Sequence, residues 1–182
     1  MEGLVYDSSD PQLVAERSAA RRLLRRFNHD LDYDDAPGRL ELLTSLLGSL
    51  DASAPPFFEP PLYVDYGYNI SVGSGFYANF GTTILDINRV TIGDRVLLGP
   101  NVHIYTVNHP LSPEERAVPQ GCPELGKPVV IEDDCWIGGN VTILPGVTIK
   151  RGSTVAAGAV VTRDVPERSL AAGNPAKVVR KI

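Results

Sequence analysis

The sequence predicts a mainly β fold, a parallel β-helix of about four coils behind a small helical segment, with one protruding loop. Three observations lead to this prediction. Apolar residues recur at every sixth position over most of the chain, the N-terminal segment has helical spacing instead, and the six-residue count stops once before it resumes. A period of six fits neither an α-helix nor a simple hairpin series, whereas short strands joined by two-residue turns fit it. Three such strands make one coil, and stacked coils bury a continuous aliphatic core.

Residues 8–52 predict two helices. Ser9 or Asp10 can cap the first helix, with Pro11 in its first turn, and leucines at helical spacing predict a second helix over 37–50. We interpret the arginines of the first helix as a solvated face; they are Arg17, Arg21, Arg22, Arg25 and Arg26. They do not indicate a nucleic-acid site, because several aspartates follow directly. The proline-rich stretch 51–61 predicts a connector that cannot continue a helix.

The six-residue repeat starts near Val72 and continues to Val161. Its inward aliphatic positions are Val72, Ala78, Ile84, Ile92, Leu98, Ile104, Ile131, Ile137, Ile143, Ile149, Val155 and Val161. Two extra residues lie between Ile84 and Ile92, near Ile87, and a long insertion follows Ile104. The insertion is rich in proline and charge, so we expect an exposed arm. A β-sandwich would need alternation by two and wider turn spacing, which the strict period of six disfavours.

These boundaries predict three parts. We expect a helical domain over residues 1–55, a β-helix over 56–165 with a loop at 106–127, and a C-terminal segment over 166–182 that contributes to cofactor binding.

Composition excludes several function classes. The net charge of −5 argues against non-specific binding of nucleic acid, which needs a basic surface. Two cysteines, Cys122 and Cys135, are too few for a disulfide framework and lack the paired spacing of a zinc site. We find no secretory signal pattern and no apolar run of ~18 residues that would span a membrane. We therefore expect a cytoplasmic protein that binds no membrane.

Several stretches resemble a known family. The run "IGGNVTILPGVTIKRGSTVAAGAVVTRDVPERSLAAGNPAKVVRKI" (137–182) resembles hexapeptide-repeat acyltransferases, and "GLVYDSSDPQLVAERSAARRLLRRFN" (3–28) resembles the helical domain of maltose O-acetyltransferases. The stretches "GFYANFGTTILD" (75–86) and "TVNHPLSPEERA" (106–117) resemble acceptor-site segments of maltose, galactoside and nodulation-factor acetyltransferases. The resemblance implies a left-handed β-helix, acetyl-CoA (acetyl coenzyme A) as co-substrate without a metal, and a sugar as acceptor. It also implies a homotrimer with sites at subunit interfaces, which suits a convex prism with little concavity of its own.

Acetyl transfer from a thioester to a hydroxyl needs a base, an oxyanion donor and alignment of both substrates. His109 is the candidate base, because a neutral imidazole titrates near neutral pH and the resemblance gives the histidine of "HP" this role. The resemblance places Asn79 beside the acceptor and the reacting acetyl group, and the N–H of Gly139 at the oxyanion. Direct attack in a ternary complex is favoured over a cysteine intermediate, because Cys135 falls on a core position.

The remaining assignments also come from the resemblance. It implies acceptor contacts from Asp7, Asp65, Tyr77, Asn79 and Asp86, and carboxylates suit sugar hydroxyls as strong acceptors. It implies coenzyme A contacts from Trp136, Gly139, Ala157, Gly158, Thr162, Arg163, Lys177 and Arg180. The galactoside type has an acidic residue after the Asp86 position and a serine at the Asp65 position, so Ile87 and Asp65 favour the maltose or nodulation type.

Other functions of the same fold remain open. A zinc carbonic anhydrase needs three histidine ligands, whereas the repeat region has only His103 and His109. Acetylation of an amino-sugar, an oligosaccharide or a xenobiotic is the alternative within the acetyltransferases. A structural β-helix without catalysis would not depend on His109 or Asn79.

Overall fold

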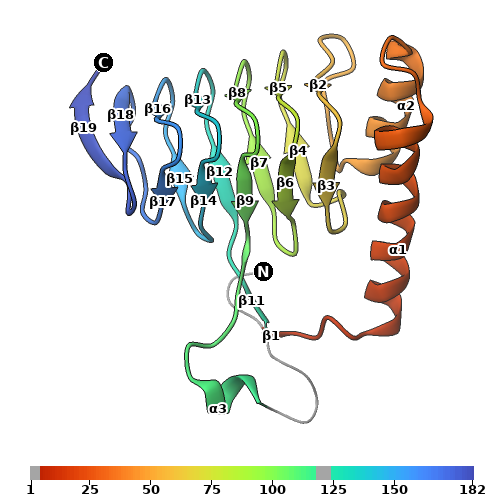
Figure 1. Ribbon diagram of the computed structural model, residues 1–182, viewed down its shortest axis with the longest axis horizontal. Coiled ribbons are helices and arrows are strands. Elements are labelled where there is room, and N and C mark those ends of the chain that lie inside the picture. The colour runs from red at the N-terminus through yellow and green to blue at the C-terminus, as the bar shows by residue number, and fades with distance from the viewer. Residues whose placement is uncertain (1–4, 118–123) are drawn as a thin grey trace.

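A computed structural model describes residues 5–117 and 124–182, and it confirms the parallel β-helix (Figure 1). Each coil passes through three sheets, which we call sheets 1, 2 and 3 in chain order. Sheet 1 contains β2 (Phe57–Phe58), β5 (Tyr77–Ala78), β8 (Leu97–Leu98), β13 (Trp136–Ile137), β16 (Thr154–Val155) and β18 (Ser169–Ala172). Sheet 2 contains β3 (Leu62–Val64), β6 (Thr82–Leu85), β9 (His103–Tyr105), β14 (Thr142–Ile143) and β17 (Val160–Val161). Sheet 3 contains β4 (Ile70–Val72), β7 (Val90–Ile92), β12 (Val129–Ile131) and β15 (Thr148–Ile149).

The every-sixth positions form the core of the prism. Ile84, Ile104 and Ile131 are fully buried, and parallel pairing keeps equivalent residues in register, as with Ile84 beside Ile104. Burying a large aliphatic side chain stabilises a fold by about 1.5–3 kcal/mol, so this stacked column is the main source of stability. Cys135 is buried as expected, and burial raises the pKa of its thiol.

The β-helix has one coil more than the sequence pattern indicated. The stretch 51–61 was expected to be a connector, but β2 lies within it and pairs in parallel with β5. Phe58 and Val64 are six residues apart and buried, in phase with the later coils. The prolines around them made this stretch look like a connector. Pro is nevertheless tolerated on a terminal coil, where its missing N–H is not needed. The structure therefore has about five turns.

Three corners join the sheets, and the extra residues of the repeat all fall at one of them. We call this the 2–3 corner; it holds the turns that follow β3, β6 and β9. The step between inward positions is eight residues from Val64 to Val72 and again from Ile84 to Ile92, and 27 residues from Ile104 to Ile131. The 1–2 corner, which holds the turns after β5, β8, β13 and β16, keeps the short turns that a period of six requires.

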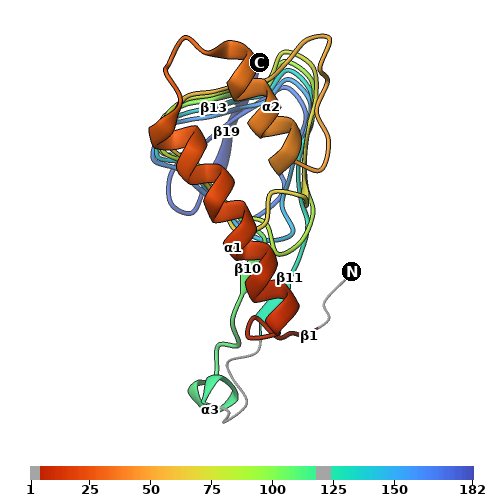
Figure 2. The ribbon, with the colours of Figure 1, turned by 90° about the vertical axis from the view of Figure 1, so that its right-hand side faces the viewer.

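Two helices cover the open end of the first coil (Figures 1 and 2). They are α1 (Pro11–Arg25), continued by the π-helical turn η1 (Arg26–Asp30), and α2 (Ala36–Leu46). Asp10 caps α1 by accepting from the N–H groups of Gln12 and Leu13, and the second helix ends four residues before the expected boundary. The side-chain amide of Asn28 both donates to and accepts from the backbone of Leu62, at 2.9 Å each, and so replaces a missing neighbour strand. This cap satisfies a sheet end that would otherwise be an exposed edge.

The insertion between β9 and β12 forms a small arm below the prism (Figure 1). Its strands β10 (Val107–Asn108) and β11 (Glu124–Gly126) pair antiparallel, and β1 (Val5–Tyr6) adds to the other edge of β11. A short helix, α3 (Pro113–Arg116), lies beyond them. Cys122 lies outside the described residues.

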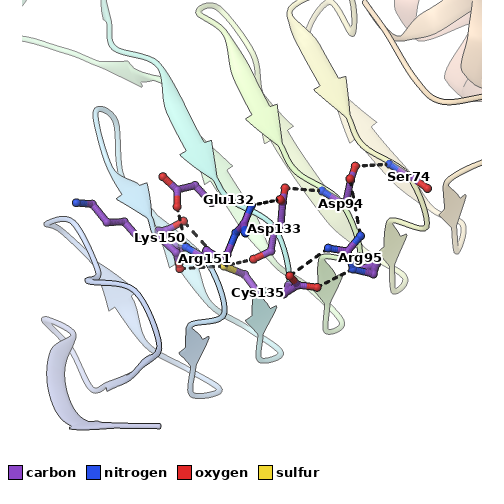
Figure 3. A network of polar contacts seen from close by, with 10 residues as sticks. Ser74, Asp94, Arg95, Glu132, Asp133, Cys135, Lys150 and Arg151 are labelled. Carbon is purple, nitrogen blue, oxygen red and sulfur yellow. Dashed lines mark hydrogen bonds and ion pairs between the residues drawn. The ribbon is translucent and has the colours of Figure 1, made fainter.

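The 3–1 corner, which joins sheet 3 to sheet 1, carries a ladder of polar contacts (Figure 3). The N–H of Ser74 donates to Asp94 at 2.9 Å, and the N–H of Asp94 donates to Asp133 at 3.0 Å. Arg95 pairs with Asp134, and Arg151 pairs with Asp133. These ion pairs are largely exposed and contribute little each, so the ladder mainly fixes successive turns relative to each other.

At the C-terminus, β18 continues sheet 1 in parallel beside β16, and β19 (Lys177–Lys181) folds back antiparallel. Within the two described ranges, no helix is long and apolar enough to cross a membrane.

Candidate active site

The 2–3 corner gathers several of the predicted acceptor residues. Asp65 follows β3, Asp86 follows β6, and the arm with His109 follows β9, so the three lie on successive turns of one corner. The chain can place polar groups here because this corner has the extra residues, whereas a two-residue turn offers little more than its backbone. This corner is therefore where a polar pocket can form on an otherwise regular prism.

Asp86 organises this corner from inside. Its carboxylate is fully buried and accepts hydrogen bonds from the N–H groups of Asp65, Tyr66 and Gly67, at 3.0, 2.9 and 2.7 Å. Burial raises the pKa of Asp86 to about 6, although the backbone hydrogen bonds oppose that shift. Both carboxylate oxygens are engaged by the turn, so Asp86 holds Asp65 in place and does not itself face the pocket.

A small pocket of about 170 Å³ opens beside this turn. It is lined by Ser8, Arg17, Asp65, Ile87 and Glu124, which come from the N-terminal segment, α1, two turns of the corner and β11. Asp65 is half-buried, and burial raises the pKa of its carboxyl group, while the positive charges of Arg17 and Arg21 oppose the shift. The volume is below the range of about 300–1,000 Å³ usual for complete ligand sites.

Asp7 lies next to this pocket in the sequence and in space. Its exposed carboxylate accepts from the hydroxyl of Ser9 at 2.6 Å and from the N–H of Ser9 at 2.9 Å, and these bonds lower the pKa of Asp7. Asp7 directly follows β1, so the pairing of β1 with β11 brings it to the arm.

His109 is exposed and directly follows β10. Thr106 fixes the start of the arm. It is fully buried, and its hydroxyl donates to the carbonyl of Leu85 at 2.7 Å. The same hydroxyl accepts from the N–H of Asn88 at 2.9 Å. A rigid coil thus fixes the direction of β10, the strand that directly precedes His109.

The other predicted catalytic groups lie on the 1–2 corner. Asn79 follows β5, and its side-chain oxygen accepts from the N–H of Phe80 at 2.8 Å. Gly139 lies two coils further along the same corner, and within the described part of the chain its N–H donates to no acceptor. Gly99 lies between them, and a Cβ at residue 99 would come within 2.5 Å of the Gly139 nitrogen. Glycine at position 99 therefore avoids a close contact with the Gly139 nitrogen.

The outer face of sheet 1 continues from this corner. Tyr77, Leu97 and Trp136 form one column on adjacent strands, and Trp136 is 57% exposed. Tyr77 stacks on Phe57, with ring centroids 6.1 Å apart. Ala157 and Gly158 lie exposed on the same corner one coil after Gly139, with the N–H of Gly158 bound to the Gly139 carbonyl.

The predicted nucleotide-binding residues form a third group. Thr162, Arg163 and Lys177 line a cavity of about 500 Å³ between the turn after β17 and the start of β19. Arg180 lies further along β19, opposite Leu170. Among the residues that the structure describes, no group of three His, Cys, Asp or Glu side chains is placed to hold a metal ion.

One chain therefore holds the predicted residues in three groups and does not bring His109 to Asn79 and Gly139. Sheet 2 separates the 1–2 corner from the 2–3 corner, and a strand such as β6 spans about 13 Å at roughly 3.3 Å per residue. Sequence reasoning missed four pocket residues: Ser8, Arg17, Ile87 as a pocket wall, and Glu124. The interpretation of Arg17 as solvated was wrong, because it is half-buried and bonded to the Ser8 carbonyl and the Tyr66 hydroxyl.

Comparison with known proteins defines the class. A family model described as the maltose acetyltransferase hexapeptide capping motif matches residues 1–51, and one described as the hexapeptide repeat of succinyl-transferase matches residues 128–163. Together with the β-helix, these matches define a hexapeptide-repeat acyltransferase.

Galactoside O-acetyltransferase of Escherichia coli is 40% identical over 99% of this chain and 86% of its own length. Nodulation protein L of Rhizobium meliloti is 44% identical over 98% of this chain and 94% of its own length. The chain belongs to the maltose and galactoside O-acetyltransferase family, and it is an acetyltransferase.

Solved structures agree with this assignment. A maltose O-acetyltransferase from Clostridium difficile superimposes with a TM-score of 0.93 at 42% identity, covering 99% of this chain and 93% of that one. A galactoside acetyltransferase in complex with coenzyme A gives a TM-score of 0.91 at 37% identity, covering 99% and 87%. A hexapeptide-repeat acetyltransferase from Vibrio cholerae, complexed with acetyl coenzyme A, gives 0.87 at 38% identity, covering 97% and 92%.

Proposed function

We propose that this protein transfers an acetyl group from acetyl coenzyme A to a hydroxyl of a sugar. The observation that carries the proposal is the pocket beside the arm, where Asp65, Glu124 and Arg17 line one small space. Carboxylates bind hydroxyl groups through strong, charge-assisted hydrogen bonds, and Ile87 offers an apolar surface for the carbon face of a sugar ring. The relatives named for galactoside or maltose acetylation support the same acceptor class.

In the proposed mechanism, His109 takes the proton from the attacking hydroxyl while its oxygen bonds to the thioester carbonyl carbon. The carbonyl oxygen becomes an oxyanion, which accepts from the Gly139 N–H. The carbon–sulfur bond then breaks, the acetyl group stays on the sugar oxygen, and the imidazolium returns its proton to the departing thiolate. Asn79 aligns the acetyl group, and no covalent enzyme intermediate is required.

The first test replaces the proposed base. The variant His109→Asn should lower kcat by about 10²–10⁴, the usual contribution of a general base, with little change in the KM for acetyl coenzyme A. Release of thiol from acetyl coenzyme A measures the rate with maltose, glucose, a galactoside and glucosamine as acceptors. His29→Asn is the matched control, because His29 is exposed in the helical cap. An active His109→Asn enzyme would rule out this base.

For coenzyme A we propose an extended site along the prism. Trp136, Ala157 and Gly158 offer an aromatic surface and small exposed residues to the pantetheine arm. Thr162, Arg163, Lys177 and Arg180 offer hydroxyl and cationic groups to the phosphates, and three of them line one cavity. The proposed C-terminal segment, 166–182, contributes to this site through β19.

We also propose that the active enzyme is a homotrimer with its sites between subunits. The separation of His109 from Asn79 and Gly139 within one chain supports this, since a neighbouring prism can bring its own 1–2 corner to the arm. The exposed column of Phe57, Tyr77, Leu97 and Trp136 is the kind of surface that another copy covers. A neighbour at this face would also enlarge the small pocket into a full cleft.

A further inference from the structure

Arg17 connects three parts of the protein that contribute to the acceptor pocket. It lies on α1, its guanidinium donates to the hydroxyl of Tyr66 and to the carbonyl of Ser8, and it also lines the pocket. Its guanidinium carbon lies 5.6 Å from the centroid of the Tyr66 ring. Tyr66 belongs to the turn that starts with Asp65, and Ser8 directly follows Asp7. Arg17 thus holds Ser8 and Tyr66, the residues that follow the two candidate acceptor-binding carboxylates, Asp7 and Asp65.

The surroundings of Arg17 make this connection rigid. Tyr66 is only 4% exposed, and its N–H donates to the buried Asp86 carboxylate, so the Tyr66 hydroxyl is a fixed anchor. The Ser8 segment has fewer constraints of its own, because β1 has only two residues and pairs with one short strand, β11. The bond from Arg17 to Ser8 is therefore an anchor for the N-terminal segment on the prism side of the pocket.

We propose that Arg17 is a positioning residue for acceptor binding. Its planar, bidentate guanidinium fixes the N-terminal segment against the Tyr66 turn, so that Asp7 and Asp65 face the same acceptor. This inference rests on the proposed sugar acetylation, because it concerns the acceptor side of that reaction. A lysine donates from one nitrogen on a flexible stem, so it lacks the rigid planar fork that reaches Tyr66 and Ser8 from two separate nitrogens.

The test compares Arg17→Met and Arg17→Lys with Glu16→Gln. Glu16 is a close control, because it also connects α1 to this turn by accepting from the Tyr68 hydroxyl at 2.7 Å, yet it does not line the pocket. Both Arg17 variants should raise the acceptor KM by about tenfold or more, with kcat and the KM for acetyl coenzyme A changed by less than about twofold. Glu16→Gln should leave the acceptor KM near its wild-type value.

A second measurement does not depend on the acceptor. Hydrogen–deuterium exchange of peptides covering residues 5–10 should be faster in Arg17→Met than in wild type and unchanged in Glu16→Gln. The proposal is overturned if exchange is unchanged, if Arg17→Lys behaves as wild type, or if Glu16→Gln raises the acceptor KM equally. If the wild-type protein acetylates no sugar, the function proposal fails, and the exchange result alone then decides whether Arg17 positions this segment.

Discussion

At the scale of single residues, Asp86 shows how a buried carboxylate can organise the turn beside a pocket. The resemblance had assigned it to the acceptor, whereas the structure has its carboxylate accepting from three backbone N–H groups of one turn. A buried carboxylate needs such partners, since unpaired burial of the charged form is strongly unfavourable. Asp65, which this turn presents, lines the pocket together with Glu124.

Asp86 leads to a prediction about pH and stability. Burial raises its pKa to about 6, above the ordinary value of 3.8 that applies in the unfolded chain. The folded state therefore binds a proton more tightly, so the stabilisation from this proton is fully present below about pH 4 and is lost as the pH rises to about 6. Asp86→Asn cannot titrate. The free energy of unfolding of wild type minus that of Asp86→Asn should thus be larger at about pH 4 than at about pH 7, by roughly 2 kcal/mol.

Urea unfolding at both pH values measures this difference. Glu41→Gln is a suitable reference, because Glu41 is exposed on α2 and has no hydrogen bond to the 2–3 corner among the described contacts. If the difference in unfolding free energy between wild type and Asp86→Asn is the same at both pH values, the pKa of Asp86 is not raised.

At the scale of elements, the close stacking of turns at the 1–2 corner controls access to the proposed oxyanion donor. A Cβ at residue 99 would lie 2.5 Å from the Gly139 nitrogen and 2.9 Å from its Cα. Gly99→Ala should therefore cover or displace the Gly139 N–H and lower kcat by about 10²–10³, the usual effect of losing one oxyanion donor.

The matched control is Gly93→Ala at the 3–1 corner. A Cβ there would meet the Asp133 side-chain oxygen at 2.3 Å and its nitrogen at 2.7 Å, so the crowding is similar but far from the site. Both variants should lower the melting temperature, whereas only Gly99→Ala should lose kcat when assayed well below it. Equal kcat values for Gly99→Ala and Gly93→Ala would show that the Gly139 N–H is not the oxyanion donor.

The same elements show how much the sequence could predict. The core positions and the parallel coils follow from the period of six, because each inward aliphatic must stack on its equivalent in the next coil. The first coil was missed although Phe58 and Val64 have the right phase, since the prolines around them resemble a connector. In retrospect the eight-residue steps at Val64 and Ile84 indicate one corner that departs from the repeat. That corner proved to hold the pocket.

The missed pocket residues have no comparable signal. Arg17 belongs to an arginine-rich helix in which all members look alike, and only the packing of α1 against Tyr66 distinguishes it. Glu124 enters the pocket because β11 pairs with both β1 and β10. Such strands of two or three residues carry no periodic pattern, so tertiary contacts and not local spacing select these side chains.

At the scale of the whole molecule, a triangular prism places its corners on different sides. The arm extends from the 2–3 corner, below the prism (Figure 1). His109 follows β10 on this arm, whereas Asn79 follows β5 at the 1–2 corner, on the other side of sheet 2. We therefore propose that two copies of the chain together supply the complete set of catalytic groups. In a closed ring of three, each subunit would give its arm to one neighbour and its 1–2 corner to the other, which makes three equivalent sites.

Mixed trimers test this arrangement directly. The variants His109→Ala and Asn79→Ala should each be nearly inactive alone. If each site combines His109 from one subunit with Asn79 from the next, random trimers formed by unfolding and refolding an equal mixture should have about a quarter of wild-type activity, because one site in four then contains both native residues. Light scattering should give the trimer mass for each variant and for the mixture. If both residues of a site came from one chain, each variant subunit would damage its own site, and the refolded mixture would stay as inactive as its components.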